Sequence, residues 1–204
     1  MESYRGENRR LVATDSVRIL RKDLAALAGL AVFSPAGDSM LLRAGPVVWY
    51  EENQVTGDSI NMYLASHQLR RVLVVGDAFA ASRTDTLGYV RFDQLSGATM
   101  NMWFEDRGLR EVELDGRARS LYHLFEDSLA NGMNRTSGDR ITMRFTDGKV
   151  SSISVAGGVE GQYLPENLIS GREGAFHLPG FLWRDDRPSL QPADRQKMSI
   201  TTSR

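Results

Sequence analysis

The sequence predicts an all-β protein built from repeated antiparallel hairpins. Residues 56–78, 96–118 and 137–159 align with one another without gaps. Apolar and polar residues alternate along both arms of each copy, which is typical of a strand with one buried face. Outside these copies, no stretch of the sequence sustains the 3.6-residue period of an amphipathic helix. These observations place the chain among the repeat-built β proteins.

Glycines fix the register of the copies. The leading glycines, Gly57, Gly97 and Gly138, are spaced by 40 and then 41 residues, and a second glycine follows each after 19 positions. An aliphatic residue comes 12 positions after each leading glycine, and turn formers such as Asp147-Gly148 separate the two arms. Each copy is therefore predicted to be one hairpin with strands of about eight residues.

The alternation also predicts which side chains line the inner face of the sheet. They are Ile60, Met62, Leu64, Val72 and Val74 in the first copy, Met100, Met102, Phe104, Val112 and Leu114 in the second, and Ile141, Met143, Phe145, Ile153 and Val155 in the third. Trp103, between two of these residues, is predicted to face outward. Stacked hairpins would bury the inner face continuously, in a long folded-over sheet or a solenoid.

Equivalent residues of successive hairpins would form ladders, one of which consists of Met62, Met102 and Met143. Methionine fills irregular gaps in ordinary cores, and its flexible side chain also adapts to variable contents. This ladder therefore has two interpretations: simple packing, or the lining of a groove that receives acyl chains.

Weaker elements surround the three hairpins. A degenerate copy is predicted over residues 14–33, where Leu24–Leu30 is expected to be a strand rather than a short Ala/Leu helix. An Asp followed by Ser or Thr and an apolar residue recurs at Asp38, Asp85 and Asp127 and marks a second, looser element between hairpins. Residues 12–165 are thus predicted to form one repeat domain.

The C-terminal part loses this pattern. Residues 166–204 contain several prolines and a charged run, and they are predicted to be an irregular, Pro-rich and partly disordered tail. The apolar residues Phe176, Phe181, Leu182 and Trp183 would allow its first half to dock on the last strand.

Composition excludes several classes of protein. The chain has 204 residues, with 25 Lys and Arg against 26 Asp and Glu, so its net charge of −1 disfavours a general nucleic-acid binder. The absence of cysteine excludes disulfide scaffolds and thiolate metal sites. No stretch approaches the roughly 20 apolar residues of a membrane helix, and residues 1–11 are too polar for a signal peptide. The chain is expected to be cytosolic, or a fragment or mature form whose export signal lies outside it.

Sequence motifs of catalysis are missing. There is no G-x-S-x-G elbow, H-E-x-x-H motif or P-loop, and His67, His123 and His177 do not have metal-ligand spacing. The pairs Gly57-Asp58 and Gly138-Asp139 suggest calcium-binding turns, but the second copy has Ala98 at the Asp position, and an Asx-type turn explains the pattern more simply. We therefore expect no enzymatic activity, no metal and no cofactor.

The frame GDSINMYLASHQLRRVLVVGDAFA, the linking segment WYEENQVTGDSI and the repeated hairpins resemble the OstA/LptA family of lipopolysaccharide-transport proteins over residues 12–165. The resemblance implies an antiparallel β-jellyroll or β-taco, in which strands fold into a V whose apolar interior holds lipid A acyl chains. It also implies a periplasmic OstA-like protein that carries lipopolysaccharide for outer-membrane assembly.

The same resemblance implies the partners. They would be lipopolysaccharide or another multi-acyl lipid, and other lipopolysaccharide-transport proteins joined by edge-strand addition, with possible head-to-tail self-association. The alternative is a structural β-repeat, such as a scaffold or an adhesin segment, with a dry core. Its ladders would fill the interior and leave no space for a lipid.

Overall fold

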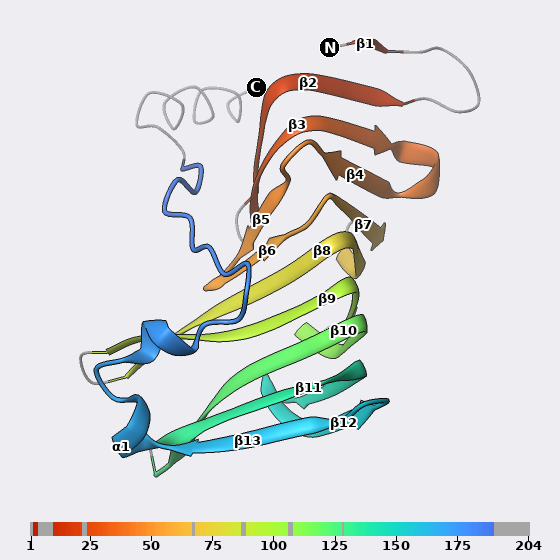
Figure 1. Cartoon of the computed structure of the whole chain (residues 1–204). Coiled ribbons are helices and arrows are strands. Elements are labelled where there is room, and N and C mark those ends of the chain that lie inside the picture. The colour runs from red at the N-terminus through yellow and green to blue at the C-terminus, as the bar shows by residue number, and fades with distance from the viewer. Residues whose placement is uncertain are drawn as a thin grey trace.

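A bent antiparallel sheet forms most of the molecule (Figure 1). The structure is a computed structural model that describes residues 2–3, 10–21, 24–66, 68–86, 89–105, 108–127 and 129–189. Within these residues the sheet has 13 strands and the only helices are short. The elements are β1 (Glu2–Ser3), β2 (Leu11–Leu20), β3 (Leu24–Ser34), η1 (Pro35–Gly37), β4 (Ser39–Arg43), β5 (Val47–Tyr50), β6 (Asn53–Thr56), β7 (Ser59–Ala65), β8 (Gln68–Thr86), β9 (Tyr89–Glu105), β10 (Gly108–Glu126), β11 (Leu129–Thr146), β12 (Lys149–Ala156), β13 (Glu160–Pro165), α1 (Glu166–Ile169) and η2 (Glu173–Phe176).

The strands follow one another in space nearly as they do along the chain. The pairing path is β1-β2-β3-β4-β7-β8-β9-β10-β11-β12, and β5, β6 and β13 pair with the remaining halves of β3, β8 and β11. The predicted all-β antiparallel class is confirmed, and the segment that begins at Leu24 is a strand, as expected.

The longest strands bend instead of ending. Strands β8 to β11 have 17 to 19 residues, so the prediction of about eight residues is wrong for them. Gly76 and Asp77 have φ values of 78° and 42°, and the register of β8 against β9 shifts between Val75 and Ala78. A bulge with a left-handed glycine turns the chain while pairing continues on both sides. The second glycine of each copy therefore lies at a corner of the sheet, where the chain bends.

The two glycines of a copy meet at this corner. A Cβ atom on Gly57 would lie 2.4 Å from Val74 Cγ1 and 3.0 Å from the carbonyl oxygen of Gly76. The backbone N–H of Asp58 donates to that same oxygen at 2.9 Å. This close approach explains why the spacing between the two glycines is constant in the repeat.

The corners divide the sheet into two facing walls. The methionine wall consists of β4, β7, β12 and the halves of β8 to β11 that pair with them. The strap wall consists of β5, β6, β13 and the other halves of the same long strands. Near the corners the walls pack together through a row of fully buried side chains, Leu42, Ile60, Val74, Met100, Leu114 and Ile141. Ile60, Met100 and Ile141, which were predicted to face inward in the three copies, are part of this row.

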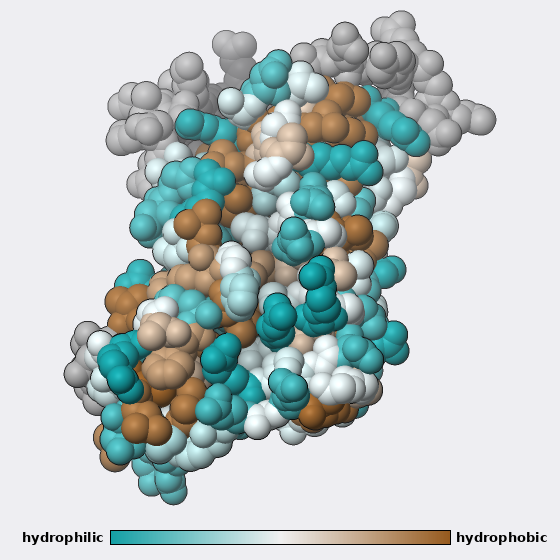
Figure 2. Space-filling model, in the orientation of Figure 1, coloured by the Kyte–Doolittle hydropathy of each residue, from teal (hydrophilic) through white to brown (hydrophobic). Residues whose placement is uncertain are grey.

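Residues 166–189, which we call the strap, run back across the outer face of the strap wall (Figure 1). Ile169 and Leu178 are buried there against Phe79, Leu121 and Met133. The contact thus extends beyond the last strand, where docking was predicted, to β8, β10 and β11. Figure 2 shows hydrophobic residues gathered at the end of the molecule where α1 lies.

Two buried glutamines of the strap wall hold the backbone of the strap. Gln54 donates to the carbonyl oxygen of Leu182 at 2.7 Å and accepts from the N–H of Arg184 at 2.8 Å. Gln94 accepts from the N–H of Leu178 at 2.9 Å. Gln94 thus provides an acceptor for a buried backbone N–H, and Gln54 binds two backbone groups of the strap.

Candidate binding groove

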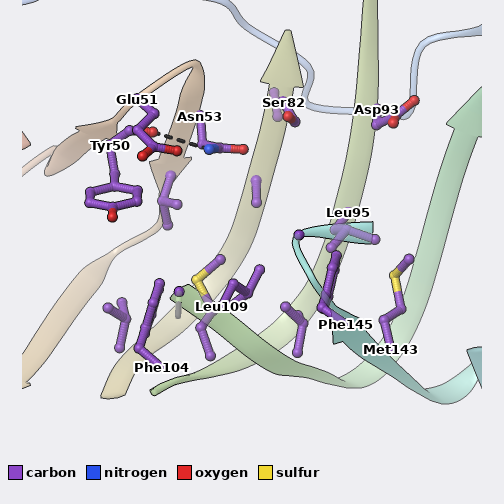
Figure 3. Close-up of a pocket in the computed structure, with 18 of the residues that line it drawn as sticks. Tyr50, Glu51, Asn53, Ser82, Asp93, Leu95, Phe104, Leu109, Met143 and Phe145 are labelled. Carbon is purple, nitrogen blue, oxygen red and sulfur yellow. Dashed lines mark hydrogen bonds between the residues drawn. The ribbon is translucent and has the colours of Figure 1, made fainter. Parts of the chain in front are cut away.

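A cavity of about 690 Å³ lies between the two walls (Figure 3). Its floor lies above the packed row at the corners, and its mouth lies between the far ends of the walls. This volume is within the range of about 300–1,000 Å³ that is typical of small-molecule and cofactor sites. Both walls contribute side chains, so the groove exists only because the long strands bend.

The methionine wall gives the groove an apolar side. Met62, Val72, Met102, Val112 and Met143 line its depth, and their strands are paired in register at these residues. Leu69, Phe104, Leu109, Phe145 and Val150 line the same wall at the mouth. The ladder of three methionines predicted from the repeat is therefore present and borders the cavity.

The predicted inner-face residues fall into three groups. Met62, Val72, Met102, Phe104, Val112, Met143 and Phe145 line the cavity. Ile60, Val74, Met100, Leu114 and Ile141 are buried in the packed row beneath it, and Val155 packs against their cluster. Leu64 is half-buried, and Ile153 is 41% exposed because it lies on the edge strand β12, although it pairs with Met143.

The strap wall supplies lining residues that sequence reasoning missed. Val48, Val55, Ala80 and Leu95 give it a small apolar surface at depth. At the mouth, the residues that line this wall are polar instead: Asn53, Ser82 and Asp93. Alternation is weak in this half of the strands because the strap buries their outer face as well. Leu69, Leu109 and Val150 were also missed, although the repeat marks them as its constant aliphatic position.

Aromatic contact closes one end of the mouth. The rings of Tyr50 on the strap wall and Phe104 on the methionine wall have centroids 6.3 Å apart in an edge-to-face arrangement. This distance is within the range of favourable aromatic pairs. The mouth is thus bridged beside β5 and continues between β8 to β10 of the strap wall and the hairpin ends of the methionine wall.

Titratable groups near the groove are held by hydrogen bonds. Asp93 Oδ1 accepts from the backbone N–H of His123 at 2.9 Å and lies 2.9 Å from its Nδ1. Burial raises the pKa of the Tyr122 phenol, and the nearby carboxylate of Asp93 raises it further, so the hydroxyl stays protonated. Among the described residues no cluster of three metal-ligating side chains occurs. His67 lies outside those residues.

The outer face of the methionine wall is polar. Trp103 lies there beside Arg71, whose guanidinium carbon is 5.8 Å from the indole centroid and 5.6 Å from the ring of Tyr63. Asn101 accepts two hydrogen bonds from the same guanidinium, at 3.1 and 2.6 Å. The outward orientation predicted for Trp103 is confirmed.

Comparison with solved structures identifies the architecture. Seven chains match, among them the crystal structure of LptH from Pseudomonas aeruginosa, described as the LptA homologous periplasmic component of a conserved lipopolysaccharide transport device. The match has a TM-score of 0.52 at 16% identity and covers 70% of this chain and 95% of LptH. The chain has the LptA-like fold. The β-taco expected from the sequence resemblance is therefore confirmed as architecture.

Sequence comparisons add nothing to this match. No protein-family model matches the chain, and no curated protein matches its sequence. In the part of the chain that the structure describes, no helix has the length and apolar character needed to span a bilayer. The features that bear on function are therefore the LptA-like fold, its bent sheet and its open apolar groove.

Proposed function

We propose that this protein binds lipopolysaccharide, or another multi-acyl lipid, through its acyl chains and helps to carry it across the periplasm for outer-membrane assembly. The observation that carries the proposal is the open apolar groove between the two walls of an LptA-like fold. The groove residues in contact with acyl chains would be those of the methionine wall, with Val55, Ala80 and Leu95 opposite them. No catalytic step is part of this role.

The energetics of lipid transfer support such a groove. Each methylene removed from water contributes about 0.8 kcal/mol, so a lipid with several acyl chains leaves a membrane slowly unless its chains are shielded. Methionine, leucine and phenylalanine side chains line the groove, and methionine adjusts its shape at little cost. A dry scaffold core would need no space of this size between its ladders.

Free strand edges support the proposed partners. Strand β12 pairs with β11 alone among the described strands, so its other side is an open edge. Open edges accept a strand from another chain through backbone hydrogen bonds. We propose other lipopolysaccharide-transport proteins, or a second copy of this chain, as the partner at such an edge. LptH, one of the solved structures with this fold, is described as periplasmic, and we propose the same location here.

A substitution that fills the groove tests this function. Ala80→Phe places a ring inside the cavity, whereas Ala156→Phe makes the same change on the outer face of β12, where Ala156 pairs with the exposed Arg140. Lipids extracted from protein purified from its own host are identified by mass spectrometry. Wild type and Ala156→Phe should carry a multi-acyl lipid, and Ala80→Phe should lose most of it. Lipid-free wild-type protein that also fails to bind added lipid A would identify a scaffold instead.

A further inference from the structure

A row of polar side chains crosses the strap wall at the mouth of the groove. Tyr50, Asn53, Ser82 and Asp93 are cross-strand neighbours in register on β5, β6, β8 and β9. Tyr122 on β10 continues the row next to Asp93, whose carboxylate raises the pKa of its phenol. All five side chains line the cavity, and we call them the mouth row. Figure 3 shows Tyr50, Asn53, Ser82 and Asp93 along one side of the pocket.

The surroundings make the mouth row distinct. One step deeper on the same wall the register neighbours are Val48, Val55, Ala80 and Leu95, which are apolar. Across the mouth the methionine wall presents Leu69, Phe104, Leu109, Phe145 and Val150. An amphiphilic ligand would therefore meet apolar side chains on one side of the mouth and hydrogen-bonding groups on the other.

The chemistry of the mouth row selects a kind of polar group. An amide, two phenols, a hydroxyl and a carboxylate bind hydroxyl and amide groups well, because they offer both donors and acceptors. The side chains that bind phosphate best are arginine and lysine, and the mouth row contains neither. Among the described lining residues Lys149 is the only cation, and it lies on the opposite wall.

Two members of the mouth row are already oriented. Asn53 Nδ2 donates to the carbonyl oxygen of Tyr50 at 3.1 Å, which fixes the plane of the amide. Asp93 is fixed by its contacts with the backbone and ring of His123. Groups that are held in place before a ligand arrives lose less entropy on binding.

We propose that the mouth row binds the hydroxyl- and amide-bearing head region of the lipid, while the acyl chains lie against the methionine wall. The inference rests on the proposed function and adds a specificity to it. At equal acyl chains, a lipid whose head carries sugar hydroxyls and an amide binds more tightly than one whose head carries a phosphate diester.

Competition between two lipids tests the mouth row. A glucosylceramide and a phosphatidylglycerol with matched acyl chains displace a fluorescent acyl-chain probe from the wild-type protein and two variants. Ser82→Ala/Tyr122→Phe removes two hydroxyls from the mouth row, and Ser152→Ala/Tyr63→Phe removes the same groups from the outer face of the methionine wall. Thermal unfolding confirms that both variants are folded.

The wild type and the outer-face variant should prefer the glucosylceramide. The mouth-row variant should lose about tenfold of this preference, which corresponds to about 1.4 kcal/mol, because two hydrogen bonds to the head region are removed. Equal binding of the two lipids by the wild type overturns the proposed specificity of the mouth row and leaves the proposed function in place. An unchanged preference in the mouth-row variant, or an equal loss in the outer-face variant, also overturns it. If neither the probe nor either lipid binds, both proposals fail.

Discussion

The methionine wall and the strap wall are made from the same long strands, yet they are built on different rules. The methionine wall has large apolar residues inside and polar residues such as Asn61 and Glu113 outside. The strap wall has a mixed inner face, with Ala80 at depth and polar residues such as Ser82 at the mouth. Its outer face carries apolar residues such as Phe79, where the strap covers them. One wall keeps a solvent-exposed face, and the other is buried on both faces. The sequence pattern along a single long strand therefore changes from regular alternation to a less regular pattern at the point where the strap begins to cover its outer face.

The largest effect is expected in the packed row of the methionine wall. Leu114 is fully buried between its neighbours, so Leu114→Ala should lower the free energy of unfolding by about 3 kcal/mol through lost burial and a residual cavity. Chemical denaturation followed by circular dichroism measures this loss. Val75→Ala on the outer face, where the side chain is 40% exposed, should cost less than about 0.5 kcal/mol. Equal costs at the two sites would contradict the assignment of inner and outer faces.

The second-largest effect on stability is expected when the strap loses its ion pair with Arg91. Arg91 is 1% exposed and donates to both carboxylate oxygens of Glu166, at 2.5 and 3.1 Å, and to Glu173 at 3.4 Å. Arg91→Leu leaves these carboxylates without their cation and should cost about 2 kcal/mol, less than a fully buried pair, since Glu166 is 28% exposed. Faster proteolysis within residues 166–189 is the direct readout.

An exposed pair provides the control for that substitution. Arg110 lies 2.5 Å from Glu105, and both side chains are more than half exposed. Arg110→Leu should change stability by less than about 1 kcal/mol because solvent screens the interaction. If Arg91→Leu were as mild as Arg110→Leu, the strap would not depend on its ion pair.

The contrast between the walls also explains what the sequence could predict. The fold class, the hairpins and the ladder of Met62, Met102 and Met143 were predictable because the methionine wall has one wet face, which produces regular alternation. In the strap wall the run Ala78-Phe79-Ala80-Ala81 is buried throughout, so no alternation marks its inner face. The lining residues of that wall were missed for this reason.

Other features depend on contacts that are distant in sequence. The second glycines fit the alternation of the second arm, so the sequence pattern did not mark a bend there. In the structure Gly76 has a positive φ, and pairing on both sides of it carries β8 around the corner. Gln54 is an ordinary polar residue until it meets Leu182, which is 128 positions away. Such a partner is defined only when the strap is placed on the wall.

Acidification should loosen the strap less than the Arg91→Leu substitution does. His177 Nδ1 lies 2.6 Å from Gln94 Nε2, which donates to it, and the imidazole ring stacks on Phe181 at 3.9 Å. Burial lowers the pKa of His177, and nearby His123, itself bound to Asp93, lowers it further. Because the folded-state pKa lies below the unfolded value of about 6.5, this contribution to stability is complete above that pH and is lost as the pH falls through the folded pKa.

Hydrogen exchange of residues 166–189 between pH 7.5 and pH 5 measures this loosening. The opening of the strap should increase on the acidic side in the wild type and lose most of its pH dependence in His177→Gln, whose side chain cannot be protonated. An identical pH dependence in the variant would contradict the assignment of the titration to His177. The methionine wall, whose packed row contains no titratable side chain, should show no such change.

The smallest effect is expected from the outer face of the methionine wall. Trp103 stacks beside Arg71 on that face and is separated from the groove by the sheet itself. In a variant that keeps Trp103 and replaces Trp49 and Trp183 with Phe, addition of lipid should leave the indole emission unchanged, since no apolar ligand reaches its environment. A blue shift on lipid binding would mean that acyl chains cover the outer face, and the distinction between a lipid-binding inner face and a solvated outer face would then be lost.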